Sequence, residues 1–362
     1  MINVTKPFTP PLSDLTKYLE KIHDRAWLTN NGPLVRELTE RLEDYLGVKN
    51  LLLTANGTLA LQVAYKALDV NQQAITSPFT FIATASAMKW QGIEPLFADI
   101  DSKTLCLCPT EVEKSITEKT EAVVPVHVYG NACDVRKFEE LSIRNNLPII
   151  YDASHTFGVQ YEGESILNWG DASTLSFHAT KLFHTVEGGG IVFKDRDTYE
   201  RAERMLNFGL GGPQDDINSL GINAKMSEVH AAYGLCVLDS MEQIFESRER
   251  ILIAYREGLS GVVTYPEWSE STSNNYAYAP ILLDSEAQCI QVLNELKEVG
   301  VIARRYFYPS LNTVSEFKDT GQSVCRKAEH AAKRAVCLPI YPSLSQEDVQ
   351  KIIGAVKLGC ER

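Results

Sequence analysis

A serine and a lysine at the end of one predicted strand carry the clearest chemical signal in this sequence. Ser173–Phe177 reads as a buried strand, Ser176 lies near its end, and Lys181 follows in a short loop before the glycine-rich turn at 187–190. A lysine in a partly desolvated pocket loses basicity, so its amine can attack a carbonyl carbon and later carry protons. The serine hydroxyl could hold a phosphate of the same ligand. A lone surface lysine is the alternative.

An acidic residue ends a second apolar strand. Asp152 closes the run that begins at Ile149, and His155 follows three residues later. A carboxylate in this position can hold a cation such as the protonated ring nitrogen of pyridoxal phosphate (PLP), whose ring accepts electrons from a substrate carbon. A helix N-cap is the alternative for Asp152, and a structural histidine is the alternative for His155.

A third feature is the turn Asn56-Gly57-Thr58, between a predicted strand and a predicted helix. Its glycine lets backbone N–H groups approach a phosphate, and Thr58 adds a hydroxyl donor. A plain N-cap turn is the alternative. Open α/β sheets bind ligands at the carboxyl ends of their strands, so all three features point to one site. Their order is that of fold-type I PLP enzymes, whereas the sequence signatures of Walker and Rossmann nucleotide loops are absent.

The elements that must position these residues follow an α/β pattern. From about residue 50, apolar strand candidates alternate with helical periodicity, which predicts a mainly parallel sheet covered by helices. The predicted strands there are Leu51–Thr54, Glu94–Phe97, Ala122–Val128, Pro148–Asp152, Ser173–Phe177 and Gly190–Lys194. A bent helix from Ser227 to about Glu257, a strand over Tyr276–Leu283 and a final helix opened by a Ser345–Asp348 capping box follow. We expect two domains: residues 1–245, with the N-terminal segment and the large PLP-binding domain, and residues 246–362, a smaller α+β domain.

The composition narrows the classes of function. The 362 residues are 44% hydrophobic and 23% charged, which is ordinary for a globular protein. The net charge of −12 argues against a general affinity for nucleic acid or anionic membrane, but not against an anionic small substrate. Neither a signal peptide nor a membrane span is indicated, so we expect a cytoplasmic location. The eight scattered cysteines predict free thiols and no metal site.

The sequence resembles the PLP-dependent sugar aminotransferases of the DegT/DnrJ/StrS type. The resemblance runs from Trp27 to Leu344, and its markers are NGTLAL at Asn56, TSPFTFIATASA at Thr76, PVHVYGNACDV at Pro125, YDASHTFGV at Tyr151, SFHATKLFHTVEGGG at Ser176 and GINAKMSEVHAA at Gly221. It implies the α/β fold of fold-type I PLP-dependent transferases, with a mainly parallel, seven-stranded type of sheet in the large domain and a smaller C-terminal α+β domain.

The resemblance implies which residues bind the phosphate of PLP. Gly57 and Thr58 would bind it by backbone and side chain, and Ser176 would join them. Asn223 matches an asparagine that reaches the phosphate from the neighbouring subunit. The chain is therefore expected to form a homodimer with shared active sites.

The resemblance also implies which residues contact the ring of PLP. Phe81 would stack on the pyridine, Asp152 would pair with its nitrogen, and His155 would lie beside its hydroxyl. Lys181 would form the Schiff base. A dehydratase branch of the family has histidine in place of that lysine, so the lysine here favours transamination.

Two departures from the family pattern, Ser154 and Ala224, are small and conservative. The family often recruits cations for the nucleotide diphosphate from both subunits, and Lys225 and either Arg304 or Arg305 are the candidates here. Aromatic residues expected to line the substrate pocket are Phe183, Tyr306 and Tyr308. The alternative for the lysine and the arginines is a solvated surface charge, and the alternative for the aromatic residues is packing in the core.

Within the family, the strings WLTNNGP, SFHATK and GIN-x-KM are similar to those of enzymes acting on dTDP-4-keto-6-deoxyglucose. The expected substrates are L-glutamate and this dTDP-keto-sugar, aminated at C4 to dTDP-4-amino-4,6-dideoxyglucose. Amination of a 3-keto-sugar is the alternative, because that branch shares SFHATK. A PLP-dependent lyase or desulfurase is a rival from another class, and it is disfavoured because no cysteine lies in a glycine- or serine-rich loop. A non-catalytic regulator would normally have a DNA-binding segment or lack the lysine.

Overall fold

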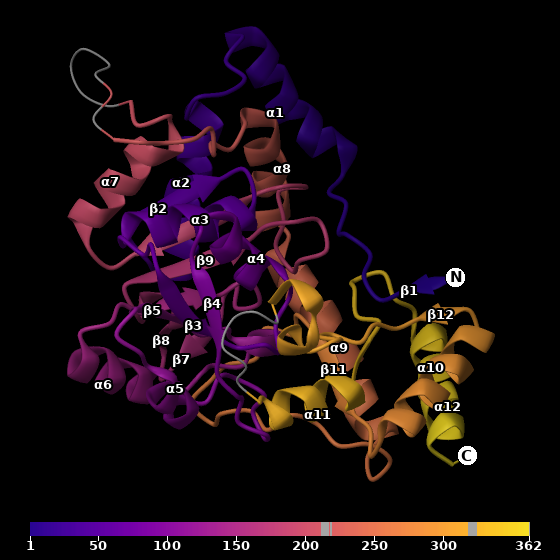
Figure 1. Ribbon diagram of the computed structural model, residues 1–362. Helices are drawn as coiled ribbons and strands as arrows, with labels where there is room; N and C mark the ends of the chain where they lie inside the picture. The colour runs from indigo at the N-terminus through magenta and orange to yellow at the C-terminus, as the bar shows by residue number, and fades with distance from the viewer. Residues whose placement is uncertain (211–216, 218, 318–323, 362) are drawn as a thin grey trace.

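Seven strands make one twisted sheet at the centre of the protein (Figure 1). The computed structural model describes residues 1–210, 217, 219–317 and 324–361. One run of hydrogen-bonded strands is β2 (Leu51–Thr54), β10 (Gly189–Phe193), β9 (Ala172–Ser176) and β6 (Ile150–Asp152), and the other is β4 (Glu94–Phe97), β3 (Gln73–Thr76) and β5 (Thr120–Val124). Parallel bridges from Val123 to Ile149 and from Val126 to Asp152 join β5 to β6. Strand β10 is antiparallel to both of its neighbours, and the other pairings are parallel. The α/β fold class is confirmed.

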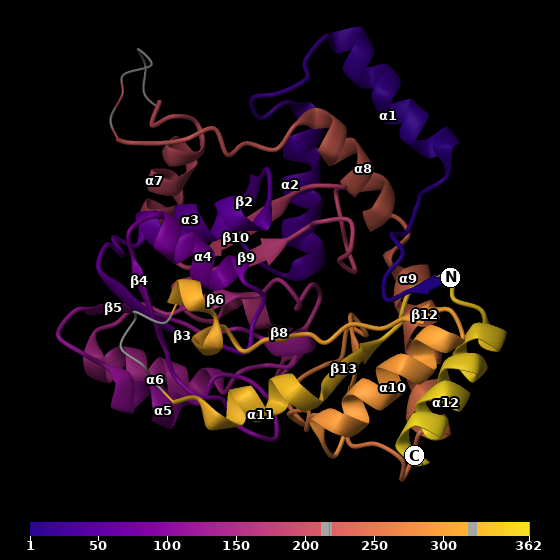
Figure 2. The same ribbon diagram turned by 45° about the vertical axis from the view of Figure 1, so that its right-hand side comes forward.

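Helices cover both faces of this sheet, because the strands are apolar on both sides. In β2, Leu51 and Leu53 belong to one buried cluster and Leu52 to another, as the alternation of a strand requires. The first cluster includes residues of α2 (Pro33–Leu46), α5 (Pro109–Ser115), α6 (Val135–Asn145) and α8 (Glu228–Leu238). The second includes residues of α3 (Gly57–Ala67), α4 (Ala83–Trp90) and α7 (Arg196–Leu206). Figure 2 shows α3 and α7 on one side of β2, with α2 and α8 on the other.

The C-terminal part has a core of its own. Strands β11 (Ala279–Leu282) and β13 (Ala335–Leu338) pair antiparallel, and their buried residues pack with those of α9 (Met241–Gly258), α10 (Glu286–Glu298) and α12 (Gln346–Glu361). Helix α11 (Arg326–Arg334) leads into β13. At the N-terminus, β1 (Ile2–Asn3) pairs in parallel with β12 (Val301–Ile302), which brings the two ends of the chain to the same part of the molecule (Figure 1). The division into 1–245 and 246–362 stays a prediction: its boundary falls inside α9, and residue 362 lies outside the described residues.

Several elements differ from the sequence-based expectation. The helix expected from 227 to 257 is two helices, because α8 ends at Leu238 and α9 starts at Met241. The strand expected from Tyr276 starts only at Ala279, and Tyr276 itself has a left-handed φ of 56° that a strand cannot accommodate. The Ser345–Asp348 cap is confirmed, since the Asp348 N–H donates to Ser345 Oγ at 3.1 Å.

The remaining elements are an N-terminal helix and several short segments. They are α1 (Leu12–Arg25), the hairpin β7 (Gln160–Tyr161) and β8 (Glu164–Ser165), and short 3₁₀ turns at Val128–Gly130, Ile166–Asn168, Leu311–Thr313 and Ser315–Phe317. Across the described ranges, no helix combines the length and the apolar character needed to cross a membrane.

One buried carboxylate ties two helices together. Glu228, at the start of α8 and only 1% exposed, accepts hydrogen bonds from the N–H groups of Leu34 at 2.8 Å and Val35 at 2.9 Å. These groups belong to the first turn of α2, which has no acid of its own and whose N-cap, Gly32, has no side chain to accept them. Glu228 therefore supplies the N-cap of α2 from another part of the chain.

Replacing this carboxylate should destabilise the protein measurably. We expect Glu228→Ala to lower the free energy of unfolding by about 2–3 kcal/mol, because two buried N–H groups lose their acceptor. Urea unfolding followed by circular dichroism measures this change. Glu246→Ala, at an exposed position on α9, is the control and should change stability by less than about 0.5 kcal/mol. Equal effects of the two substitutions would contradict the capping role.

Candidate active site

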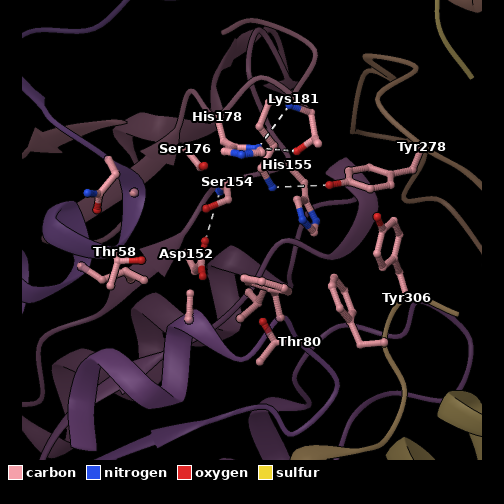
Figure 3. Close-up of a pocket in the computed structure, with 18 of the residues that line it drawn as sticks. Thr58, Thr80, Asp152, Ser154, His155, Ser176, His178, Lys181, Tyr278 and Tyr306 are labelled. Atoms are coloured by element: carbon pink, nitrogen blue, oxygen red, sulfur yellow. Dashed lines mark hydrogen bonds between the residues drawn. The ribbon is translucent and has the colours of Figure 1, made fainter. Parts of the chain in front are cut away.

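A cavity of about 370 Å³ opens where β2, β6 and β9 end at their carboxyl edge. It is lined by residues from the turn after β2, from the loops after β6 and β9, and from the C-terminal part of the chain (Figure 3). Seven of the residues predicted from the sequence meet there: Gly57, Thr58, Phe81, Asp152, His155, Ser176 and Lys181. The three sequence features thus lie at one site, as expected for an open α/β sheet.

The turn that opens α3 is held close to the end of β9. The Asn56 side chain caps the helix by accepting from the Leu59 N–H at 2.9 Å. A Cβ on Gly57 would lie 2.9 Å from Ser176 Cβ, and a Cβ on Gly189 would lie 2.7 Å from the Asn56 carbonyl oxygen. Only glycine fits both places. The first N–H groups of α3 lack partners within the helix, so this turn and the nearby hydroxyls of Thr58 and Ser176 form a cradle suited to an anion.

Two neutral donors hold the carboxylate of Asp152, which is 5% exposed. Thr84 Oγ1 donates to Oδ2 at 2.7 Å, and the Ser154 N–H donates to Oδ1 at 3.1 Å. Both contacts fix the direction of the carboxylate without neutralising it. A buried carboxylate of this kind is suited to a cationic group of a ligand.

Lys181 lies in the loop after β9 and reaches into the cavity (Figure 3). Burial lowers the pKa of its amine to about 8, and the nearby charge of Asp152 opposes part of this fall. Its Nζ donates to the hydroxyl of Tyr278, with 3.4 Å between the two atoms. At neutral to mildly alkaline pH, a substantial fraction of the amine is therefore unprotonated and nucleophilic.

His155 is a neutral neighbour of the lysine. Burial and the charge of Lys181 hold its pKa well below the usual 6.5. Its Nδ1 accepts from the Tyr129 N–H at 3.1 Å, which places the ring proton on Nε2. The ring lies parallel to Phe307, with centroids 5.8 Å apart, and 4.5 Å from the ring of Tyr278. Nε2–H is thus a fixed donor rather than a charge.

Three other predicted residues, Lys225, Asn223 and Phe183, lie outside this cavity. Lys225 lines a second cavity of about 390 Å³ and donates to Asn207 Oδ1 at 2.8 Å. Asn223 is exposed and forms an isolated antiparallel bridge with Asn207. Phe183 is 1% exposed and stacks on Phe157 with centroids 4.5 Å apart. Their roles in binding stay predictions.

The four candidates in the C-terminal part differ in their local contacts, in their exposure and in whether they line the cavity. Arg305 already has partners nearby: it forms an ion pair with Glu286 at 3.0 Å, and its guanidinium lies 3.4 Å from the centroid of the Tyr308 ring. Arg304 is exposed, and Tyr308 is 49% exposed. Tyr306 lines the cavity. Within one subunit, Tyr306 is thus the only one of these four that faces the site among the described residues.

Sequence reasoning missed several residues of the site. Thr84 lies one helical turn after Thr80, and their hydroxyls are 3.0 Å apart, so the string TFIATA was the available signal. His178 and Glu187 also line the cavity, with His178 Nε2 3.6 Å from Glu187 Oε1. Tyr278 belongs to no string that the sequence marks out. Among the described residues, no group of three or more His, Cys, Asp or Glu could hold a metal ion.

The profile of the DegT/DnrJ/EryC1/StrS aminotransferase family matches residues 13–357. The chain belongs to this family. It is 39% identical to a dTDP-4-amino-4,6-dideoxy-D-glucose transaminase of Shigella dysenteriae, over 98% of each chain. A protein of the same name from Escherichia coli is 36% identical, over 97% of this chain and 96% of the relative.

Solved structures agree with this assignment. A crystal structure of DesI in the presence of its TDP-sugar product superposes with a TM-score of 0.95 at 32% identity, covering 100% of this chain and 93% of that one. An aminotransferase from Streptoalloteichus hindustanus, TlmJ, gives a TM-score of 0.92 at 25% identity, over 99% and 98%. The fold is thus that of the sugar aminotransferases, and the protein is an enzyme that transfers amino groups.

The depressed basicity of Lys181 can be tested by chemical labelling. At pH 8, an amine with a pKa near 8 has a roughly hundredfold larger neutral fraction than an ordinary lysine. We expect the acetylation of Lys181 in the cofactor-free protein, measured by peptide mass spectrometry, to have its pH midpoint about two units below that of exposed lysines in the same sample. Asp152→Asn should move the midpoint further toward acid, because the carboxylate favours the ammonium. A midpoint near that of the exposed lysines would disprove this account.

Proposed function

We propose that this enzyme uses PLP to transfer the amino group of L-glutamate to C4 of dTDP-4-keto-6-deoxy-D-glucose, giving dTDP-4-amino-4,6-dideoxy-D-glucose. The observation that carries the proposal is that the buried carboxylate of Asp152 and the partly buried amine of Lys181 line one cavity, which also has an anion cradle. The names of the two relatives at 39% and 36% identity support the sugar and the position of amination.

The residues of the cavity fit PLP at each of its polar groups. The turn at Gly57 and Thr58, with Ser176, suits the phosphate, since a Cβ on Gly57 would fill the space beside Ser176. Asp152 suits the protonated ring nitrogen, and the donor Nε2–H of His155 suits the ring hydroxyl. When bound, PLP supplies a carbonyl for the lysine and an electron sink that acidifies the C–H bond beside a substrate amine.

The protein's own residues supply charge and proton handling. Asp152 is fixed by two donors, so it can keep the cofactor nitrogen protonated without turning away. Lys181, once released, can accept a proton from the donor carbon and later deliver it to the sugar carbon, because a pKa of about 8 lets the amine both take up and release a proton near neutral pH. His155 stays neutral and adds no competing charge.

A homodimer completes the proposal. The substrate diphosphate requires cations, yet Lys181 is the only lysine or arginine among the described residues that line the cavity. Lys225 and Asn223 lie in a different, accessible region, where Phe208 (52% exposed) and Ile222 (42% exposed) are also uncovered. Exposed apolar residues beside polar side chains are typical of a subunit interface. A partner subunit would bring these groups to the cavity.

The amino-sugar product suits a cell-surface glycan such as the O-antigen of lipopolysaccharide, since nucleotide-linked sugars are glycosyl donors. A cytoplasmic location is supported by the eight cysteines, which are all free and of which six are buried.

The product identity tests the proposal directly. Purified protein incubated with PLP, L-glutamate and dTDP-4-keto-6-deoxy-D-glucose should form 2-oxoglutarate and an equimolar amino-sugar. Mass spectrometry and NMR should find an equatorial amino group at C4. The 3-keto isomer, tested in parallel, should be turned over at least about tenfold more slowly. A product aminated at C3 would overturn the regiochemical assignment and leave the family assignment intact.

Removing the lysine should abolish turnover without unfolding the protein. We expect Lys181→Ala to lower kcat by ~10³-fold or more, because both the nucleophile and the proton carrier are lost. The visible absorbance band of lysine-bound PLP should vanish, while the unfolding temperature stays within a few degrees. Substantial residual turnover in this variant would refute the role of Lys181.

A further inference from the structure

Tyr278 reaches the active-site lysine from the C-terminal part of the chain. It directly precedes β11, and its hydroxyl lies 3.4 Å from Lys181 Nζ (Figure 3). The ring is held on two sides: it lies 4.5 Å from the ring of His155 and meets Tyr306 edge-on, with centroids 6.1 Å apart and planes at 85°. The hydroxyl is therefore fixed in place beside the amine. At 3.4 Å the bond is long, as such contacts often are before a substrate binds.

A buried arginine holds the segment that carries this tyrosine. Arg248, on α9, is 3% exposed and donates from Nη1 to the carbonyl oxygens of Tyr276 at 3.4 Å and Ala277 at 3.2 Å. Burial lowers its pKa to about 10, so the guanidinium is still charged at neutral pH. Its Nε has no hydrogen-bond partner among the described residues. A charged group left in the interior without a carboxylate is costly, which indicates that its position matters.

A second clamp joins the same segment to the loop after β6. Asn275 is 1% exposed, and its Nδ2 donates to the carbonyl oxygens of His155 at 2.8 Å and Phe157 at 3.0 Å. Its Oδ1 accepts from the Ala277 N–H at 3.2 Å. A Cβ on Gly130 would come within 2.8 Å of the same oxygen, so the fit is tight. The backbone that precedes Tyr278 is thus fixed to both parts of the molecule.

We propose that Tyr278, held by Arg248 and Asn275, is a positioning residue that keeps the amine of Lys181 at the reacting carbon while the lysine is free of the cofactor. The proposal rests on the function proposed above, in which the free lysine carries a proton between two substrates. A lysine side chain has four flexible bonds, and a single fixed partner removes most of that freedom. A phenol hydroxyl can accept from an ammonium and donate to an amine, so the contact survives each proton transfer.

The surrounding charges are compatible with this role. Burial raises the pKa of Tyr278, so its hydroxyl stays protonated wherever the lysine titrates. The other titratable groups that line the cavity are Asp152, His155, His178, Glu187 and Tyr306. Of these, Asp152 favours the ammonium of Lys181, and His155 is neutral. Asp152 would be engaged by the cofactor, which leaves Tyr278 as the partner of the released amine.

The experiment compares Tyr278→Phe with Tyr276→Phe. Both substitutions remove one hydroxyl from the same segment, but that of Tyr276 donates to Glu249 at 2.6 Å instead of contacting the lysine. The first readout is the pH midpoint of Lys181 acetylation in the cofactor-free protein. Loss of the acceptor destabilises the ammonium, so Tyr278→Phe should lower the midpoint by about half a unit or more relative to wild type, and Tyr276→Phe should leave it unchanged.

The second readout is the exchange of the Cα proton of L-glutamate with D2O, followed by NMR in the PLP-loaded enzyme without a sugar. We expect the exchange rate to fall about tenfold or more in Tyr278→Phe and less than about twofold in Tyr276→Phe. PLP affinity should be the same in both variants. Equal midpoints and equal exchange rates in the two variants would overturn the positioning role. A wild-type protein that neither binds PLP nor exchanges would instead count against the proposed function, while the acetylation midpoints would still decide the role of Tyr278.

A third variant guards against a Tyr278→Phe protein that does not fold. Arg248→Lys keeps a cation and the Tyr278 hydroxyl, but a lysine cannot reproduce the hydrogen bonds of the guanidinium to the carbonyls of Tyr276 and Ala277. It should shift the midpoint in the same direction by a smaller amount. Combined with Tyr278→Phe, it should add nothing, because both act through the same contact. An additive effect would show that Arg248 acts independently of Tyr278 and would contradict the proposal.

Discussion

The site depends on keeping one lysine amine in a desolvated pocket. Moving the pKa of Lys181 from 10.5 to about 8 corresponds to on the order of 3 kcal/mol of penalty on its charged form. The charge of Asp152 opposes part of this penalty, and the fold holds that carboxylate in place with Thr84 and the Ser154 N–H. The neutral state of His155 follows from the same environment, since burial and the lysine both oppose its protonation. The chemistry of the three groups is thus set by one shared constraint.

The sheet satisfies this constraint through close backbone contacts at one edge. Strand β10 runs antiparallel between β2 and β9, pairing Gly189 with both Thr54 and Ser176. This register brings the turn at Asn56 and Gly57 against the end of β9, at separations that leave no room for a Cβ. The anion cradle and the lysine loop are therefore built on the same three strands. A change of register in β10 would separate them, so the antiparallel strand is as important to the site as the parallel ones.

The sequence could predict those site residues that follow a recognisable strand, but not those that only tertiary contacts bring to the site. Asp152, Ser176 and Lys181 each follow a buried apolar strand within a few residues, and the rule that strand ends meet at one edge places them together. Tyr278 and Arg248 have no such signal, because their contacts join segments that are not neighbours in the chain. The hydroxyl of Tyr278 meets a lysine 97 residues away, and Arg248 bonds to carbonyls 28 and 29 residues away. The apolar run at Tyr276–Leu283 predicted a strand from its first residue, but the left-handed φ of Tyr276 excludes that residue, and the strand starts at Ala279, directly after Tyr278. Similarly, α8 ends before Asp239 and α9 begins after Ser240, and neither of these two residues is a proline or glycine that would mark the break in the sequence.

The link between the two parts of the chain has a mechanical consequence. Tyr278, Tyr306 and Phe307 reach the cavity from the C-terminal part, and Asn275 bonds to carbonyls of the loop that carries His155. The C-terminal part is in turn connected to the first residues of the chain through β1 and β12. Any rotation of this part about α9 would therefore move the hydroxyl of Tyr278 and the ring of Tyr306 relative to Lys181 at the same time. Contacts to the substrate sugar that favour one orientation would consequently act on the lysine as well, and binding energy far from the reacting carbon could be used to align the proton carrier.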